Sequence, residues 1–164
     1  MRHFFTFLLL VVTVFSQDQD VKFTDVRFEN FLLKHAVAQG YENGSYPVIQ
    51  LDSDSNGVIS QEEAKKVHRL TCLGSISGLN INDKITAIGG IEFFENLEFL
   101  DISYQRIPHA HIDKNKKLKT FVSNAGELVS TSFIGLDSLT VIDIDDNRMY
   151  SIILRQLPNL RSVS

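Results

Sequence analysis

The chain has 164 residues, of which 43% are hydrophobic and 22% are charged, and its formal net charge is −4. This is the ordinary composition of one globular domain. No basic tract or basic-aromatic patch is present, so nucleic acid is excluded as an expected partner. Cys72 is the one cysteine, so no internal disulfide is expected. Its apolar neighbours predict a buried, unreactive thiol.

Residues 1–16 have the three parts of a secretory signal peptide. Arg2 and His3 come first, an apolar stretch runs from Phe4 to Phe15, and a small-x-small site ends at Ser16. The apolar stretch is too short for a membrane span, which takes about 20 residues. We therefore expect a secreted or cell-surface protein with no membrane span. The alternative is that this stretch is a buried helix of the fold.

Residues 17–75 predict a small helical cap. Apolar side chains at helical spacing over 25–39 predict a first helix, which Thr24 or Asp25 can begin and Gly40 can end. Residues 61–69 predict a second short helix, because Ser60 and Glu63 have the spacing of a capping box. The segment 47–51 between them is more strand-like than helical.

Residues 52–63 match the EF-hand calcium-loop pattern D-x-[DN]-x-[DN]-G-x5-E at every position. Calcium prefers six to eight oxygen ligands, and Gly57 permits the sharp turn that lets a short loop supply them. The expected ligands are side-chain oxygens of the first residues, a backbone carbonyl, a residue holding a water, and a two-oxygen glutamate: Asp52, Asp54, Asn56, Val58, Ser60 and Glu63. Because only the outgoing helix is evident, we expect a half EF-hand. The alternative is a surface turn with solvated carboxylates.

From residue 76 to residue 164 the sequence repeats every 21 residues. One column of the repeat is Leu97, Leu118, Leu139 and Leu160, and parallel columns include Leu100, Phe121, Ile142 and Val163. One period earlier, Ile76, Leu79 and Ile81 are the expected first copy. A fixed period of this length is typical of a solenoid. The alternative is an ordinary α/β domain with coincidental leucines.

The consensus L-x-x-L-x-L-x-x-N-x-L predicts the fold class: α/β, a short leucine-rich-repeat solenoid of about 21-residue repeats. The ninth position carries asparagine only at Asn147, and Lys84, Gln105 and Gly126 replace it elsewhere, so we expect irregular turns. The side chains between the apolar columns are expected to point outward: Asn80, Asp101, Val122, Asp143, Asn82, Ser103, Asn124, Asp145, Phe99, Thr120 and Val141.

In the order of its parts the chain resembles bacterial secreted leucine-rich-repeat proteins with an N-terminal EF-hand-type calcium loop. The specific parts are the loop at 52–63 and the entry into the repeats at 85–102, which contains Ile-Gly-Gly-Ile-Glu-x-Phe-x-Asn-Leu. The scarcity of ladder asparagines and the absence of strand cysteines depart from that family. The resemblance implies an interaction role, with no catalytic residues to carry over.

The sequence therefore favours a secreted, non-catalytic protein that recognises a protein or a glycan through the strand face of its solenoid, with one structural Ca²⁺. The alternative is a calcium sensor or buffer in which the ion site itself is the function. No motif of a hydrolase, metalloprotease or phosphate loop is present, so no enzyme is expected. Leu154, Leu157, Leu160 and Val163 predict an open apolar rung at the C-terminal end. Such a rung belongs to a truncated longer repeat protein, or it is covered by a partner or through self-association.

Overall fold

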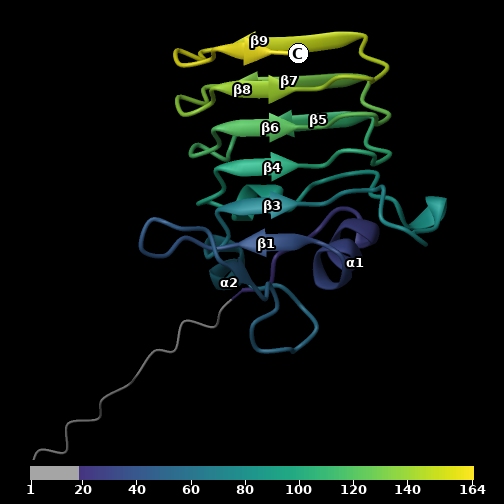
Figure 1. The fold of residues 1–164 in the computed structure, drawn as a ribbon, viewed down its shortest axis with the longest axis vertical. Helices are drawn as coiled ribbons and strands as arrows, with labels where there is room; N and C mark the ends of the chain where they lie inside the picture. Colours follow the sequence, from purple (N-terminus) through teal and green to yellow (C-terminus); the bar gives the residue numbers. More distant parts are fainter. Residues whose placement is uncertain (1–18) are drawn as a thin grey trace, which may run out of the picture.

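The computed structural model describes residues 19–164, so the predicted signal peptide at 1–16 lies outside the described part. The described chain is mostly β structure with few helices, wound into a solenoid with turns of about 21 residues. Figure 1 shows these turns stacked along the long axis, with α1 and α2 at the end opposite the C-terminus. Among residues 19–164, no helix has both the length and the hydrophobicity needed to span a membrane.

The main sheet has seven strands in the order β10-β8-β6-β4-β3-β1-β2. From β3 to β10 the strands are parallel, and corresponding residues pair in register, as Leu100 does with Phe121 and Phe121 with Ile142. β1 is antiparallel to both of its neighbours. The strands are β1 Val37–Gln39, β2 Val48–Ile49, β3 Arg69–Thr71, β4 Phe99–Asp101, β6 Thr120–Val122, β8 Val141–Asp143 and β10 Ser162–Val163.

The return segments form a second parallel sheet, in the order β5-β7-β9. Its strands are β5 His109–Ile112, β7 Ser130–Ile134 and β9 Ser151–Arg155. In β5 and β7 every second residue is buried, which is the period of a strand and not that of a helix. The expectation of an α/β fold is therefore wrong, because the return segments of the described turns carry strands where an α/β solenoid carries helices.

The hydrophobic core lies between the two sheets. Leu97, Leu118 and Leu139 are fully buried, as are Leu100, Phe121 and Ile142. The rings of Phe121 in the main sheet and Phe133 in the second sheet meet edge-to-face, with centroids 5.0 Å apart. Each turn therefore contributes equivalent apolar side chains to one continuous core, as the 21-residue period predicts.

The N-terminal end holds both α-helices, and each is shorter than the sequence pattern indicates. α1 spans Val26–Lys34, and the segment predicted to continue it to residue 39 forms β1. α2 spans Gln61–Lys65, and β3 begins at Arg69. In both places the chain leaves the helix to pair with neighbouring strands. The tertiary hydrogen bonds of the sheet override the local helical pattern there.

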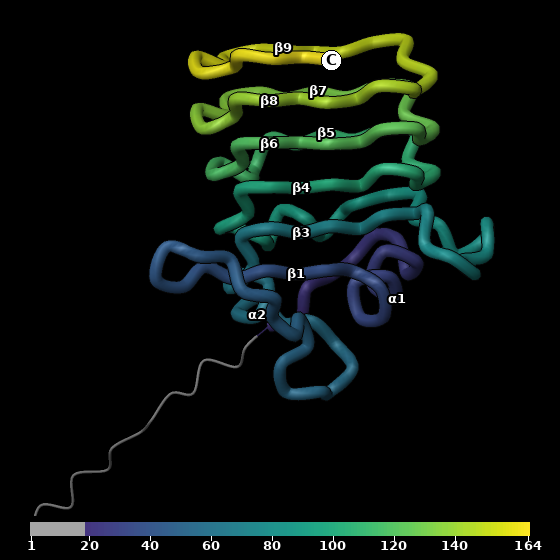
Figure 2. Tube along the Cα trace, in the orientation of Figure 1, coloured from purple at the N-terminus to yellow at the C-terminus, as the bar shows by residue number. Residues whose placement is uncertain are grey.

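The first copy of the repeat is not at Ile76, Leu79 and Ile81. Leu70 pairs with Leu100 across β3 and β4, so Leu70 and Cys72 occupy the positions that Leu100 and Ile102 hold in the next turn. The intervening chain includes two short 3-10 helices, η1 Ile81–Asp83 and η2 Ile91–Phe93. Figure 2 shows the 76–84 segment as an excursion from the stack. The exposure of Ile76 and Ile81 agrees with that placement.

The C-terminal turn is uncovered in the structure. All residues of β9 are exposed, and Leu154 and Val163 retain 38% and 47% of their accessible surface. Leu157 and Leu160 are only partly buried against the core. The expectation that these four side chains line an open apolar rung therefore agrees with their exposure.

Candidate calcium loop and recognition face

The carboxylates of Asp52, Asp54 and Glu63 come together at the entry to α2. One oxygen of each lies within 4.8 Å of the others. Gly57 has a φ of +85°, and the backbone N–H of Gly57 donates to Asp52 Oδ2 at 3.0 Å. Ile59 is buried and anchors the loop to the core, while Asp54 is exposed and Glu63 is itself buried at the start of α2. This grouping of three hard oxygen donors suits a cation such as calcium.

Glu63 has two roles in this loop. Its Oε2 accepts from the backbone N–H of Ser60 at 3.0 Å and the Ser60 hydroxyl accepts from the Glu63 N–H, so the predicted capping box begins α2. Its Oε1 accepts from the N–H and the hydroxyl of Ser53, at 2.6 and 2.8 Å. Burial raises the pKa of the Glu63 carboxyl, but hydrogen bonds from Ser60 and Ser53 outweigh burial and hold the pKa below its ordinary value.

The other predicted ligands lie in the same loop but differ in their surroundings. The Asn56 amide donates to Asp54 Oδ2 at 2.9 Å, while Asn56 Oδ1 accepts from the N–H of Val58. Ser60 uses its hydroxyl as the helix cap, so its role toward an ion would pass through water. The residues present therefore fit a calcium ion, provided that Glu63 exchanges its hydrogen bonds from Ser53 for the metal.

Residues 19–21 form hydrogen bonds with residues 59–61, at the C-terminal end of the candidate calcium loop. The N–H of Val21 donates to the carbonyl of Ile59 at 2.8 Å, and the N–H of Gln61 donates to Gln19 at 2.8 Å, forming an antiparallel bridge around Asp20 and Ser60. The sequence pattern did not indicate this contact, because a two-residue bridge leaves no periodic signal. It fixes the end of the loop that carries Ser60 and Glu63.

The outward side chains of the main sheet form half-buried columns, as predicted for most of them. Asp101, Val122 and Asp143 align across β4, β6 and β8, beside Phe99, Thr120 and Val141. Ser103 is an exception, since it is 4% exposed and its hydroxyl donates to Asp101 at 2.6 Å. Asn80 and Asn82 are also exceptions, since they lie in the excursion around η1 and not in the sheet.

One end of this face carries an aromatic and cationic cluster that the sequence did not reveal. The guanidinium of Arg69 lies over the ring of Phe99 at 4.3 Å and over the ring of Tyr46 at 5.3 Å. Both distances are within the range of a cation–π contact. Tyr46 reaches Arg69 from the segment that joins β1 to β2. No spacing in the sequence indicates this contact, because the cluster joins three separate segments.

A charged network adjoins the cluster. Glu98 accepts from Tyr46 Oη at 2.8 Å and from Lys119 Nζ at 2.7 Å. Burial raises the pKa of Glu98, but these hydrogen bonds outweigh it and the net pKa is lowered. Nδ1 of His68 is buried 3.5 Å from Glu98 Oε1 without forming a hydrogen bond. The network fixes Tyr46, and with Tyr46 the position of the Arg69 guanidinium.

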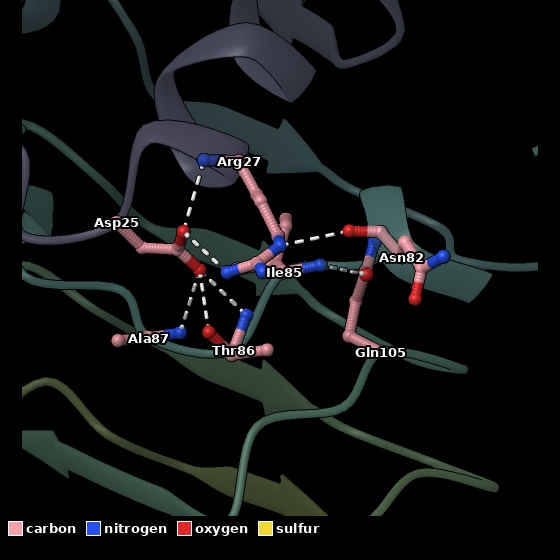
Figure 3. Close-up of polar contacts among 7 residues, drawn as sticks. All are labelled: Asp25, Arg27, Asn82, Ile85, Thr86, Ala87 and Gln105. Atoms are coloured by element: carbon pink, nitrogen blue, oxygen red, sulfur yellow. Dashed lines mark hydrogen bonds and ion pairs between the residues drawn. The ribbon is translucent and has the colours of Figure 1, made fainter. Parts of the chain in front are cut away.

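Two side chains, those of Asp25 and Gln105, form further hydrogen bonds that attach α1 and residues 85–87 to the rest of the solenoid (Figure 3). Asp25 Oδ2 accepts from the N–H and hydroxyl of Thr86 at 2.7 and 2.9 Å and from the N–H of Ala87 at 3.1 Å, while Oδ1 accepts from the N–H of Arg27. Gln105 Oε1 accepts from Ile85 N–H at 2.8 Å.

Cys72 is fully buried, and burial raises the pKa of its thiol. Both observations agree with the expectation of an unreactive cysteine.

Comparison with known proteins does not place the chain in a group. No protein-family model matches the sequence, and no curated protein matches it.

Proposed function

We propose that the protein is a secreted or cell-surface recognition protein of the leucine-rich-repeat type, which binds a protein or a glycan through the outer face of its main sheet without catalysis. The observation that supports this most is the Arg69 guanidinium, which contacts the rings of both Tyr46 and Phe99 at one end of that face. Arginine and aromatic side chains contribute most to binding energy at interfaces, above all when they are already ordered.

The columns beside this cluster give the face its character. Asp101 and Asp143 supply acceptors, Val122 supplies apolar surface between them, and Val141 supplies apolar surface in the neighbouring column. A partner that presents donors and apolar groups at strand spacing would complement them. In this proposal the solenoid serves as a rigid support, because each strand is held in register by its neighbours.

Arg69→Ala tests the proposed face. We expect a surface partner to be captured by the wild-type protein and to be lost by this variant, because the ordered guanidinium and its stacking on two rings disappear together. The matched control is Arg155→Ala, which removes an exposed arginine from β9 in the other sheet. A partner captured equally by wild type and by Arg69→Ala would contradict the proposal, as would loss in the control alone.

We further propose that Asp52, Asp54, Asn56, the Val58 carbonyl, water at Ser60 and Glu63 hold one structural Ca²⁺ in an EF-hand-type loop. Bound calcium would neutralise the three grouped carboxylates and hold the loop against α2. The second candidate function, a calcium sensor or buffer, is favoured by the same grouping of carboxylates. A regulatory response would appear as a change in partner capture when calcium is removed, whereas a structural ion would change stability.

Calorimetric titration with Ca²⁺ and thermal unfolding with and without chelator test the ion site. A bound ion should stabilise the fold by about 2.7 kcal/mol at a hundredfold excess over its dissociation constant. Asp54→Ala is the variant of choice, because Asp54 is exposed and not part of the capping box, so it removes a ligand oxygen without weakening α2. Glu62→Gln is the control, since it removes an acid from the same helix outside the ligand set. Equal calcium binding by both variants, or none by wild type, would exclude the site.

A further inference from the structure

A hollow of about 520 Å³ lies beside the recognition face, between the β1–β2 connection, β2 and the segment that enters the candidate calcium loop. Its volume falls within the range of pockets that hold small molecules. It shares Ser53 with the loop and His68 with the charged network. Its other lining residues belong neither to the proposed recognition face nor to the proposed calcium ligands, so the hollow is a separate feature of the fold.

One wall of the hollow is aromatic and apolar, and its rings pack against one another. Tyr41, 55% exposed, has its ring 5.2 Å from that of Tyr46 and 5.6 Å from that of His68. Tyr46 is in turn bonded to Glu98. Pro47 and Ile49 extend the apolar surface next to Tyr41. A ring that is already ordered loses little conformational freedom when a ligand stacks on it, which favours binding.

The rest of the lining is polar and supplies both donors and acceptors. Glu42 and Lys66 lie there with one charge of each sign, and among residues 19–164 neither side chain makes a hydrogen bond or an ion pair. Gln50 donates its amide to Ser55 at 3.2 Å, which leaves its carbonyl oxygen to accept. The opposite charges of Glu42 and Lys66 do not favour a simple cation or anion. They suit a neutral ligand rich in hydroxyl groups, each of which both donates and accepts.

We propose that this hollow is a carbohydrate-binding site in which the apolar face of a sugar ring stacks on Tyr41. The hydroxyl groups at the edge of that ring then bond to Glu42, Gln50 and Lys66. A sugar combines an apolar C–H face with a polar rim. The hollow likewise combines an aromatic wall with polar side chains, and the opposite charges of Glu42 and Lys66 cancel. This site is distinct from the recognition face, because Arg69 is not among the residues that line it.

The test is an NMR titration of the purified, processed protein with three soluble probes: cellotetraose, maltotetraose and chitotetraose. We expect at least one probe to shift the amide resonances of residues 40–53. Tyr41→Ala should weaken that binding roughly tenfold, as loss of an aromatic contact implies, and Tyr41→Phe should restore it. Tyr150→Ala, which removes a 91% exposed tyrosine from the far end of the solenoid, should leave binding unchanged.

Several results would overturn the proposal. One is that no probe shifts these resonances at millimolar concentration, and another is that Tyr41→Ala binds as tightly as wild type while its spectrum shows an intact fold. Sugar-induced shifts confined to β4, β6 and β8 would assign the glycan to the recognition face and not to the hollow. A peptide that occupies the hollow when the sugars do not would also overturn it. Failure at the hollow leaves the Arg69 test of the recognition face unaffected.

Discussion

Asp25 is the residue that ties the N-terminal helix to the solenoid. It caps α1 through the Arg27 N–H and reaches residues 86 and 87 through its second oxygen. It is 6% exposed, so its charge is stabilised by these hydrogen bonds and not by water. Burial raises its pKa, but the hydrogen bonds from Thr86, Arg27 and Ala87 more than offset burial and lower the pKa overall.

Asp25→Ala should destabilise the fold by roughly 2–4 kcal/mol, because it removes a helix cap and leaves buried donors unpaired. The effect should depend on pH. Since the folded-state pKa is lowered, the stabilisation by Asp25 is complete above its unfolded pKa of about 4 and is lost as the pH falls through the folded-state pKa. Urea unfolding of both proteins across pH 2–7 measures the difference. A difference that grows with acidity would contradict this account.

At this scale the sequence predicted local contacts and missed distant ones. The cap at Asp25 and the capping box of Ser60 and Glu63 are visible in the sequence because their partners lie two or three residues away. The bonds from Asp25 to Thr86 and from Tyr46 to Glu98 join residues 61 and 52 positions apart. No local pattern encodes such pairs. The ion loop could be proposed from the sequence because all its expected ligands lie within 12 consecutive positions.

At the scale of the element, the turns that follow the main-sheet strands share a left-handed residue. Tyr104, Ala125 and Asp146 recur at the repeat spacing with φ values of 62°, 50° and 54°. Gln105 and Asn147 follow two of them and bond across to the neighbouring turn. Gln105 donates to the carbonyl of Cys72, and Asn147 donates to that of Ser123. Glutamine therefore fills the asparagine position, so these turns are more regular than the degraded sequence motif predicts.

Ala125→Gly should stabilise the protein slightly, by roughly 0.5 kcal/mol. Glycine avoids the steric penalty of the left-handed conformation, and this gain exceeds the extra entropy that glycine adds to the unfolded chain. Ala87→Gly is the control, because Ala87 is not among the residues with positive φ and should only lose stability. Denaturant midpoints of the two variants provide the measurement. Equal destabilisation of both would show that the turn at Ala125 is not strained.

At the scale of the whole molecule, the open C-terminal turn leads to a prediction about association. Val163 and Leu154 are exposed at the edges of the two sheets, and an uncovered edge of this kind readily pairs with another chain. We expect light scattering to show concentration-dependent association, and Val163→Lys to reduce it. Val26→Lys, which changes an exposed apolar residue of α1 away from both sheet edges, should have no effect. A monomeric wild-type protein at high concentration would contradict this prediction.

The 21-residue period of the solenoid could be predicted from the sequence, but the secondary structure of its return segments could not. Leu97, Leu118 and Leu139 all enter the core, because equivalent positions of a repeat occupy equivalent places. The return segments are too short to separate helix from strand by pattern alone. Hydrogen bonds between neighbouring turns decide in favour of strands. The sequence pattern placed the first repeat copy wrongly in the excursion at 76–84, because Ile76 and Ile81 continue the apolar spacing by coincidence. Both side chains are exposed.

The constant separation of paired strands has a consequence for how the chain folds. β4, β6 and β8 pair with partners 21 positions away, so each pairing closes a chain segment of the same length and carries the same entropic cost. The excursion between β3 and β4 makes that closure longer, at 30 positions. The slowest pairing is therefore expected between β3 and β4, and once it has formed, the remaining turns can add one after another, as links of a one-dimensional chain.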